Sequence, residues 1–160
     1  MGDSPTYEGV KTFKFGDSAE LADRLAALVV AGVKTGTCSA AVDGPDTEIG
    51  ERQICLNGAG TPVCEIETVS METLPFAAVT PEMAALEGEG DLSYRYWREA
   101  HEAYYQREGT WAPDMDVIFE TFRVTRILDD AFAKAAPAAL KAERDEAFAN
   151  GYTALGADHG

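Results

Sequence analysis

Residues 17–42 read DSAELADRLAALVVAGVKTGTCSAAV, and this stretch predicts a helix followed directly by a strand. Apolar side chains recur at helical spacing through its first half, at Leu21, Leu25, Leu28 and Val29. We therefore expect a helix over about Ser18 to Ala31, opened by a capping box that Asp17 and Glu20 form. Thr35 to Val42 is short and β-branched at intervals, which favours a strand.

Further apolar runs predict the other strands, at Lys11 to Phe15, Gln53 to Leu56, Pro62 to Val69 and Val117 to Leu128. The second and third runs flank Asn57-Gly58-Ala59-Gly60, whose glycines can take the positive φ angles of a hairpin turn. The strand from Pro62 is expected to continue towards Leu74, because apolar and acidic residues alternate along it.

Two helices are expected in the middle of the chain. Thr80-Pro81-Glu82 begins the first, with the proline at a favourable opening position, and Gly88 and Gly90 break it. Asp91 caps the second, which runs to about Arg107.

The C-terminal segment is alanine-rich. Asp129 to Asn150 is expected to be helical with a restart at Pro137, and Gly151 to Gly160 should fray. We expect one domain over residues 1–128 and a helical extension and tail over residues 129–160. Alternating βαβ units are absent, which disfavours a parallel doubly wound sheet. The expected fold is α+β, a small antiparallel β-barrel, partly closed and decorated with helices.

The charge of the chain limits its partners. Its 160 residues include 13 Lys+Arg and 28 Asp+Glu, a formal net charge of −15 at pH 7. We expect weak binding to long RNA, through a local patch of Lys14, Lys34 and Arg123. The longest apolar run, Leu25 to Val33, is far short of the roughly 20 residues that cross a bilayer. Met1 to Thr6 lacks the features of a signal peptide, so we expect a cytoplasmic protein without membrane contact.

The cysteines give no sign of a metal site. Cys38, Cys55 and Cys64 have no C-x-x-C spacing and no paired histidine, so buried, reduced thiols are the simplest interpretation. Phosphate-binding, dinucleotide-binding and nucleophile-elbow motifs are also absent from the sequence. We expect no metal and no cofactor.

Gly32-Val33-Lys34-Thr35-Gly36-Thr37-Cys38-Ser39 stands out as a candidate functional motif. It places one lysine, two threonines and a serine where a helix ends and a strand begins. A surface lysine after a helix is also commonplace, because the helix dipole favours a cation there. In a regular strand Lys34 and Thr37 would face opposite sides, so a shared site needs Gly36 to reorient the chain.

The helix expected over Asp91 to Arg107 is rich in rings, with Tyr94, Tyr96, Trp97, His101, Tyr104 and Tyr105. They form stripes at spacings of three and four residues. Such stripes are either core and rim or an open face that stacks on bases. Trp97 and His101 are the candidates for ligand contact.

Several segments occur in a characteristic order: Phe15-Gly16-Asp17-Ser18, Gly32 to Thr37, Leu56-Asn57-Gly58, Pro62 to Thr68, Glu87-Gly88-Glu89-Gly90-Asp91, Trp97 and His101. In this combination the chain resembles the ASCH domain family of the PUA-like superfamily over roughly residues 13 to 128. It resembles particularly the longer bacterial branch, in which a Trp…His helix follows the Glu-Gly-x-Gly-Asp segment.

The resemblance implies a PUA-like β-barrel with a cleft for RNA or modified nucleosides. Compact bacterial members hydrolyse N4-acetylcytidine to cytidine and acetate with a Lys, a Thr and a downstream Glu. Matched by motif, these are Lys34, Thr37 and Glu87, with Glu89 as the alternative acid. Compact members carry an Arg where this chain has Ser39. Other members are associated with RNA binding or RNA cleavage.

We therefore expect a metal-free amidohydrolase acting on an acylated nucleoside. Burial would lower the pKa of Lys34, which could then accept a proton from Thr37 or from a water, while Glu87 passes a proton to the departing nitrogen. None of these three is expected in the apolar core, so their variants should fold. The candidates for ligand binding are Thr35, Ser39, Glu89, Trp97 and His101.

The alternative is a module that binds RNA or a nucleotide in the same cleft, with Trp97 or a tyrosine stacked on a base and Lys34 on a phosphate. A ribonuclease that uses His101 for proton transfer is a third hypothesis. The expected partner is a small nucleoside or a short RNA. The sequence leaves the acyl group and the oligomeric state open.

Overall fold

The computed structural model describes residues 6–151. The strands are β1 (Thr6–Tyr7), β2 (Val10–Phe13), β3 (Gly36–Ala40), β4 (Arg52–Leu56), β5 (Pro62–Pro75) and β6 (Asp116–Ile127). The helices are α1 (Ala19–Val30), α2 (Pro81–Leu86), α3 (Tyr94–Glu108) and α4 (Asp130–Ala149), with short 3-10 turns at Ala41–Asp43 and Phe76–Ala78. Fraying was expected over Gly151 to Gly160. Apart from Gly151, these residues lie outside the described part of the chain.

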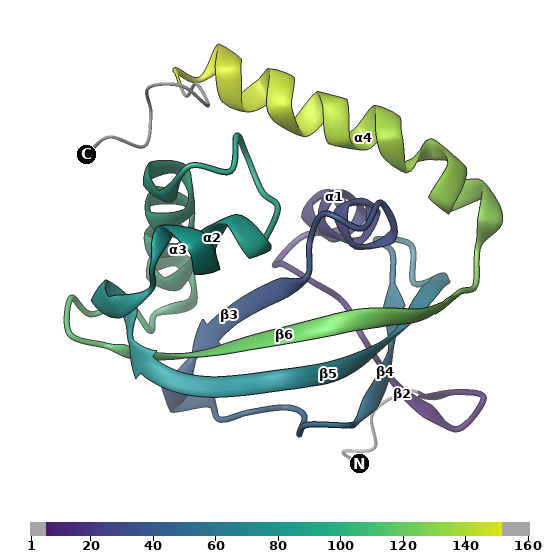
Figure 1. Ribbon diagram of the computed structural model, residues 1–160, viewed down its shortest axis with the longest axis horizontal. Helices are drawn as coiled ribbons and strands as arrows, with labels where there is room; N and C mark the ends of the chain where they lie inside the picture. The colour runs from purple at the N-terminus through teal and green to yellow at the C-terminus, as the bar shows by residue number, and fades with distance from the viewer. Residues whose placement is uncertain (1–5, 152–160) are drawn as a thin grey trace.

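The strands form one curved sheet in the order β1-β2-β4-β5-β6-β3 (Figure 1). The expected α+β class is confirmed, but the sheet is open and mixed, not a closed antiparallel barrel. It does not close because β1 and β3 are its two edges and lie at opposite ends of the strand order. It is mixed because the chain leaves β2 through α1 and β3 and returns in the same direction, so β4 pairs with β2 in parallel.

The helices cover one side of the sheet and one of its ends. α1 lies over the concave face, α4 crosses α1 on the side away from the sheet, and α2 and α3 stand together at one end of the long β5–β6 pair (Figure 1). One apolar cluster joins α1 to the sheet, and it consists of Ala26, Val29, Cys55, Val63, Cys64, Ile66 and Phe122. A second joins α3 to the sheet's end, around Phe76, Trp97, Tyr105 and Val117. All three cysteines are free, as expected.

The helix starts differ from two of the predicted caps. Ser18, not Asp17, caps α1, because its Oγ accepts a hydrogen bond from the Leu21 amide at 3.1 Å. Ser93, not Asp91, caps α3 by accepting from the Tyr96 amide at 3.0 Å. In both cases a hydroxyl one or two residues nearer the helix reaches the free amide first. The predicted start of α2 is confirmed, with Pro81 at its first turn.

α4 continues through Pro137 without the predicted restart. Pro137 lies on the exposed side of the helix, so water can solvate the carbonyl that loses its donor. α4 packs on both sides of the proline: Phe132 lies against the apolar cluster that includes Ala26 and Val29 of α1, and Glu143 pairs with Arg24 of α1. No helix within residues 6–151 combines the length and apolar character needed to cross a bilayer.

Candidate functional site

A cleft of about 590 Å³ opens between α1, α3 and the concave face of the sheet. Its size falls in the range of roughly 300–1,000 Å³ that is usual for small-molecule sites. The structure brings six of the predicted site residues into its lining, namely Lys34, Thr37, Ser39, Glu87, Glu89 and His101. The cleft is therefore the candidate site.

Lys34 is the buried centre of this site. Gly32, with a φ of 83°, ends α1, and the turn that follows sends the Lys34 side chain inward, where it is 1% exposed. Its Nζ donates to Gly36 O at 3.0 Å, to Glu87 Oε1 at 3.2 Å and to Glu89 Oε2 at 2.7 Å. These bonds use all three protons of an ammonium group.

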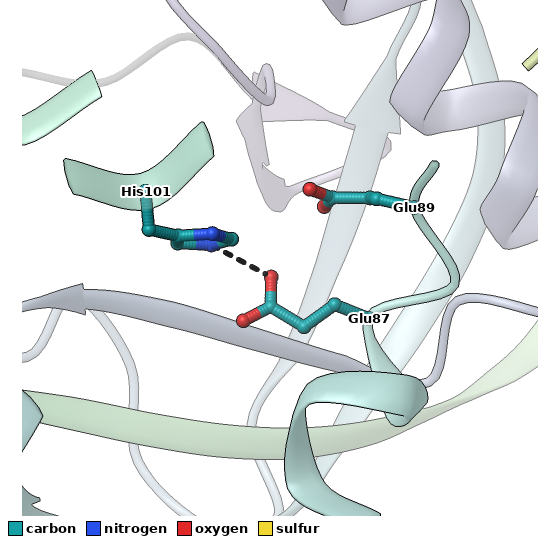
Figure 2. A group of neighbouring side chains, drawn as sticks. All are labelled: Glu87, Glu89 and His101. Carbon is teal, nitrogen blue, oxygen red and sulfur yellow. Dashed lines mark hydrogen bonds and ion pairs between the residues drawn. The ribbon is translucent and has the colours of Figure 1, made fainter. Parts of the chain in front are cut away.

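Glu87 is also 1% exposed, and both of its carboxylate oxygens have polar partners. Its Oε2 accepts from Trp97 Nε1 at 2.7 Å, and its Oε1 lies 3.2 Å from His101 Nε2 (Figure 2). His101 Nδ1 lies 2.9 Å from the carbonyl oxygen of Trp97. Both partners of the imidazole accept, so the ring is doubly protonated when both bonds form. Glu87 is thus an anion between two cations.

The two carboxylates differ in pKa. Burial opposes the ionisation of Glu87, but the charges of His101 and Lys34 and its hydrogen bonds lower its pKa to about 2. Burial raises the pKa of Glu89, and Glu87 adds to the effect, while Lys34 opposes it without reversing it. Neighbouring carboxyl groups with pKa values pushed apart are typical of acid–base sites. Of the two carboxyl groups, Glu89 is therefore the one that binds a proton more readily.

The pKa of Lys34 contradicts the predicted role of this residue as a base. Burial lowers it, but the charges of Glu89 and Glu87 raise it by more, so it lies above its ordinary value. Glu87 likewise raises the pKa of His101 against the effect of burial. Lys34 is therefore held as an ammonium group, which does not fit the base role expected from the sequence.

Thr37 reaches the cleft because β3 begins only at Gly36, so Lys34 lies before the strand and not within it. Gly36 does not adopt a positive φ; it is needed because a Cβ there would lie 2.9 Å from the Phe119 ring. Within residues 6–151, Thr37 makes no hydrogen bond to Lys34. Thr37 lines the cleft, and within the described residues no hydrogen bond joins it to Glu87 or Glu89.

Two of the residues predicted to contact a ligand, Trp97 and Thr35, do not line the cleft. Trp97 is 2% exposed and stacks on Phe76 and His101, with ring centroids 5.1 Å and 4.5 Å away, so it has no face for a base. It acts as the donor that fixes Glu87. Thr35 lies outside the cleft lining and is bonded to Leu86 O through its backbone amide at 2.8 Å.

The predicted basic patch does not form. Lys34 is buried among carboxylates, and Arg123 pairs with Glu67 at 2.5 Å outside the cleft lining. The carboxylates that line the cleft are Glu20, Asp43, Asp46, Glu87, Glu89, Glu108, Glu120, Glu143 and Glu146; its cations are Lys14, Arg24, Lys34, Arg107 and the protonated His101. The lining is acidic, which disfavours a polyanion.

Sequence reasoning missed the part that α4 plays in the site. Glu143 Oε2 accepts from the Gly90 amide at 2.7 Å, and Arg144 Nη1 donates to Gly88 O at 2.9 Å and to Gly90 O at 2.5 Å. Arg24 of α1 holds Glu143 in turn, at 2.8 Å. α4 thus clamps the loop that carries Glu89. No local signal points to this, because 53 or more residues separate the partners.

Close packing on the other side also fixes this loop. Gly88 has a φ of 71°, and a Cβ there would lie 2.6 Å from the carbonyl oxygen of Val33, next to Lys34. A larger residue would push the loop away from the end of α1. The glycine therefore allows Glu87 and Glu89 to approach Lys34.

Arg144→Ala should lower the free energy of unfolding by about 1–3 kcal/mol, because it leaves the Gly88 and Gly90 carbonyls without their donor. Urea denaturation measures the change. Lys141→Ala is the matched control, since Lys141 pairs only across the exposed surface of the same helix with Asp145. Equal, small losses in both variants would show that the clamp contributes nothing.

The cluster also resembles a cation site. Glu87, Glu89 and His101 offer ligand atoms that all lie within 4.8 Å of one another (Figure 2). However, the Lys34 ammonium group contacts both carboxylates and takes the place that a cation would need. A metal ion would have to displace a buried, hydrogen-bonded charge, so the residues fit a metal poorly.

Comparison with known proteins identifies the family of the domain. The family model of the ASCH domain matches residues 11–126, which leaves α4 outside it. The crystal structure of an ASCH domain from Lactobacillus crispatus JV V101 is 32% identical, with a TM-score of 0.66 over 71% of this chain and 77% of that one. The crystal structure of protein EF3133 from Enterococcus faecalis V583, described under the family model DUF984, is 29% identical, with a TM-score of 0.65 over 74% of this chain and 82% of that one. No curated protein matches. With its sequence and its fold in agreement, the chain belongs to the ASCH domain family, which is PUA-like.

Proposed function

We propose that the cleft hydrolyses the amide bond of a small acylated nucleoside such as N4-acetylcytidine. The observation that carries the proposal is the pair Glu87 and Glu89, one fixed as an anion and the other with a raised pKa, beside one ammonium group. Amide hydrolysis needs a nucleophile, a group that moves a proton and stabilisation of an oxyanion. The cleft offers a side chain for each.

In this mechanism the Thr37 hydroxyl attacks the acyl carbon and Glu89 accepts its proton. Once Glu89 is protonated, it no longer neutralises the charge of Lys34, and this positive charge stabilises the oxyanion that develops on the acyl oxygen. The C–N bond then breaks, and Glu89 returns the proton to the departing nitrogen. A water molecule then attacks the acyl-threonine and gives a proton to Glu89; as the bond from the acyl carbon to Thr37 Oγ breaks, Glu89 returns this proton to Oγ and the acid is released. Glu87 takes no proton, because its role is to hold Lys34 and His101 in place.

The charge of the cleft supports a neutral nucleoside over RNA. Arg24 and Arg107, two of its five cations, are paired with Glu143 and Asp17 at 2.8 and 2.9 Å. Lys34 is buried. A phosphate chain would therefore meet uncompensated carboxylates. The burial of Trp97 also leaves only a tyrosine to stack on a base in the RNA alternative.

The test is to incubate the purified protein with acylated nucleosides, N4-acetylcytidine first, and with short RNAs, and to separate the products by chromatography. We expect acetate and cytidine from the unmodified protein and at least a hundredfold slower release from Thr37→Val. Thr35→Val is the matched control, since Thr35 lies two residues away but outside the cleft lining, and it should keep full activity. Cleavage of RNA with every acylated nucleoside left intact would contradict the proposal.

A further inference from the structure

Tyr105 carries a buried hydroxyl without a well-formed hydrogen bond. Its side chain is 1% exposed, and it lines the cleft from α3, one turn after His101. Within residues 6–151, its Oη has no partner at hydrogen-bond geometry. The Cys38 thiol is its polar neighbour, and sulfur is only a weak donor and acceptor. A buried polar group left unpaired is costly, and native proteins keep few of them.

The ring of Tyr105 is fixed, so its hydroxyl cannot turn away to find another partner. The ring packs edge-on against Phe76 and Tyr104, with centroids 6.1 and 5.7 Å apart, and lies 6.1 Å from His101. Burial raises the pKa of Tyr105 and that of the Cys38 thiol. The hydroxyl is therefore a neutral donor and acceptor held at a fixed point beside the Cys38 thiol, on a residue that lines the cleft.

A second buried polar atom without a partner in the described residues provides a comparison. Asp91 Oδ2 is also unpaired, but the other oxygen of that carboxylate accepts from the Ser93 amide at 2.9 Å, and Asp91 is not part of the cleft lining. Of the two, Tyr105 alone has an unpaired group on a residue that lines the space where a ligand would lie.

We infer that the Tyr105 hydroxyl is a ligand-binding group that hydrogen-bonds an uncharged polar atom of the nucleoside, such as a carbonyl oxygen or amino group of its base. The inference rests on the proposed function for the class of ligand. A site built around such a hydroxyl discriminates against analogues that lack the matching group, because they leave it unpaired. Tyr105 is thus a specificity-determining residue, whereas Glu89 and Thr37 carry the reaction.

Tyr105→Phe separates this role from a structural one, because it removes only the oxygen. If the hydroxyl awaits a ligand, the variant loses no strong native hydrogen bond, and its melting temperature should rise by about 2–4 °C. Its affinity for cytidine, measured by calorimetry, should fall about fivefold. Opposite signs for stability and affinity are the signature of the proposed role. Tyr7→Phe, in β1 and outside the cleft lining, should change neither quantity.

Two results would overturn the inference: a lower melting temperature for Tyr105→Phe, which would reveal a strong native partner, or an unchanged cytidine affinity. If the unmodified protein neither binds cytidine nor hydrolyses any acylated nucleoside, the proposed function fails. The melting temperature of Tyr105→Phe then tests the inference about Tyr105 separately. A rise still indicates a hydroxyl without a strong native partner, and a fall contradicts the inference.

Discussion

Lys34→Met should lower the free energy of unfolding by about 3–5 kcal/mol at pH 7, one of the largest effects of any single substitution in this protein. The substitution keeps the length of the side chain but removes the charge that Glu87 and Glu89 share. Both carboxylates then stay buried with less compensation. Lys34 variants were expected from the sequence to fold normally, but the burial of this residue overturns that expectation.

The pH dependence of Lys34→Met should identify the cause. In the unmodified protein Glu87 has a lowered pKa, so its contribution is present above its ordinary value of 4.5 and is lost as the pH falls towards about 2. Without Lys34 the carboxylates are harder to ionise in the folded state, which then binds more protons than the unfolded chain. The difference in the free energy of unfolding between Lys34→Met and the unmodified protein should therefore become smaller as the pH falls from 7 to about 5.

Urea denaturation across this pH range measures both effects. Lys14→Met is the control, because Lys14 is exposed and its contact with Gly58 O, at 3.3 Å, is on the surface. A loss below about 1 kcal/mol for Lys34→Met, the size of a surface ion pair, would contradict the buried cluster.

Glu89→Gln should lower kcat for the acylated nucleoside by about 10²–10⁴-fold while the protein stays folded. Glutamine keeps the shape of the side chain but cannot accept and return a proton. Glu89 is 13% exposed and bonded to Lys34, so an amide is tolerated there more readily than at a fully enclosed position.

Glu87→Gln is the matched comparison. Glu87 is enclosed by donors from Lys34, Trp97 and His101, and a neutral amide there leaves two buried cations with less compensation. We expect this variant to lose about 3–5 kcal/mol of stability, with activity falling as the folded fraction falls. The reverse pattern, a stable but inactive Glu87→Gln and an active Glu89→Gln, would contradict this assignment. It would give proton transfer to Glu87 and the structural role to Glu89.

Local patterns predicted the local structure well. The helix of α1, the hairpin of β4 and β5, and the Thr80-Pro81 start of α2 depend on neighbouring residues, and the structure has all three. The parallel pairing of β2 with β4 depends on the path of the chain between them, which no period in the sequence records. For the same reason the open sheet was not foreseen.

The resemblance to the family, more than the residues alone, predicted which side chains meet in the cleft. The sequence predicted a lowered pKa for Lys34, whereas the structure raises it, because only burial was considered and the two carboxylates lie 53 and 55 residues away. The unpaired hydroxyl of Tyr105 and the clamp by Glu143 and Arg144 depend wholly on tertiary packing. Sequence spacing carries no information on either.

The division of roles between Glu87 and Glu89 is tested most directly by the carbon-13 shifts of their side-chain carboxyl groups, followed by NMR from pH 2 to 8 and assigned with Glu87→Gln and Glu89→Gln. Glu89 should titrate above the ordinary value of 4.5, while Glu87 stays ionised down to about pH 2. Titration of both groups together near 4.5, or of Glu87 at the higher pH, would contradict the assignment of the mobile proton to Glu89.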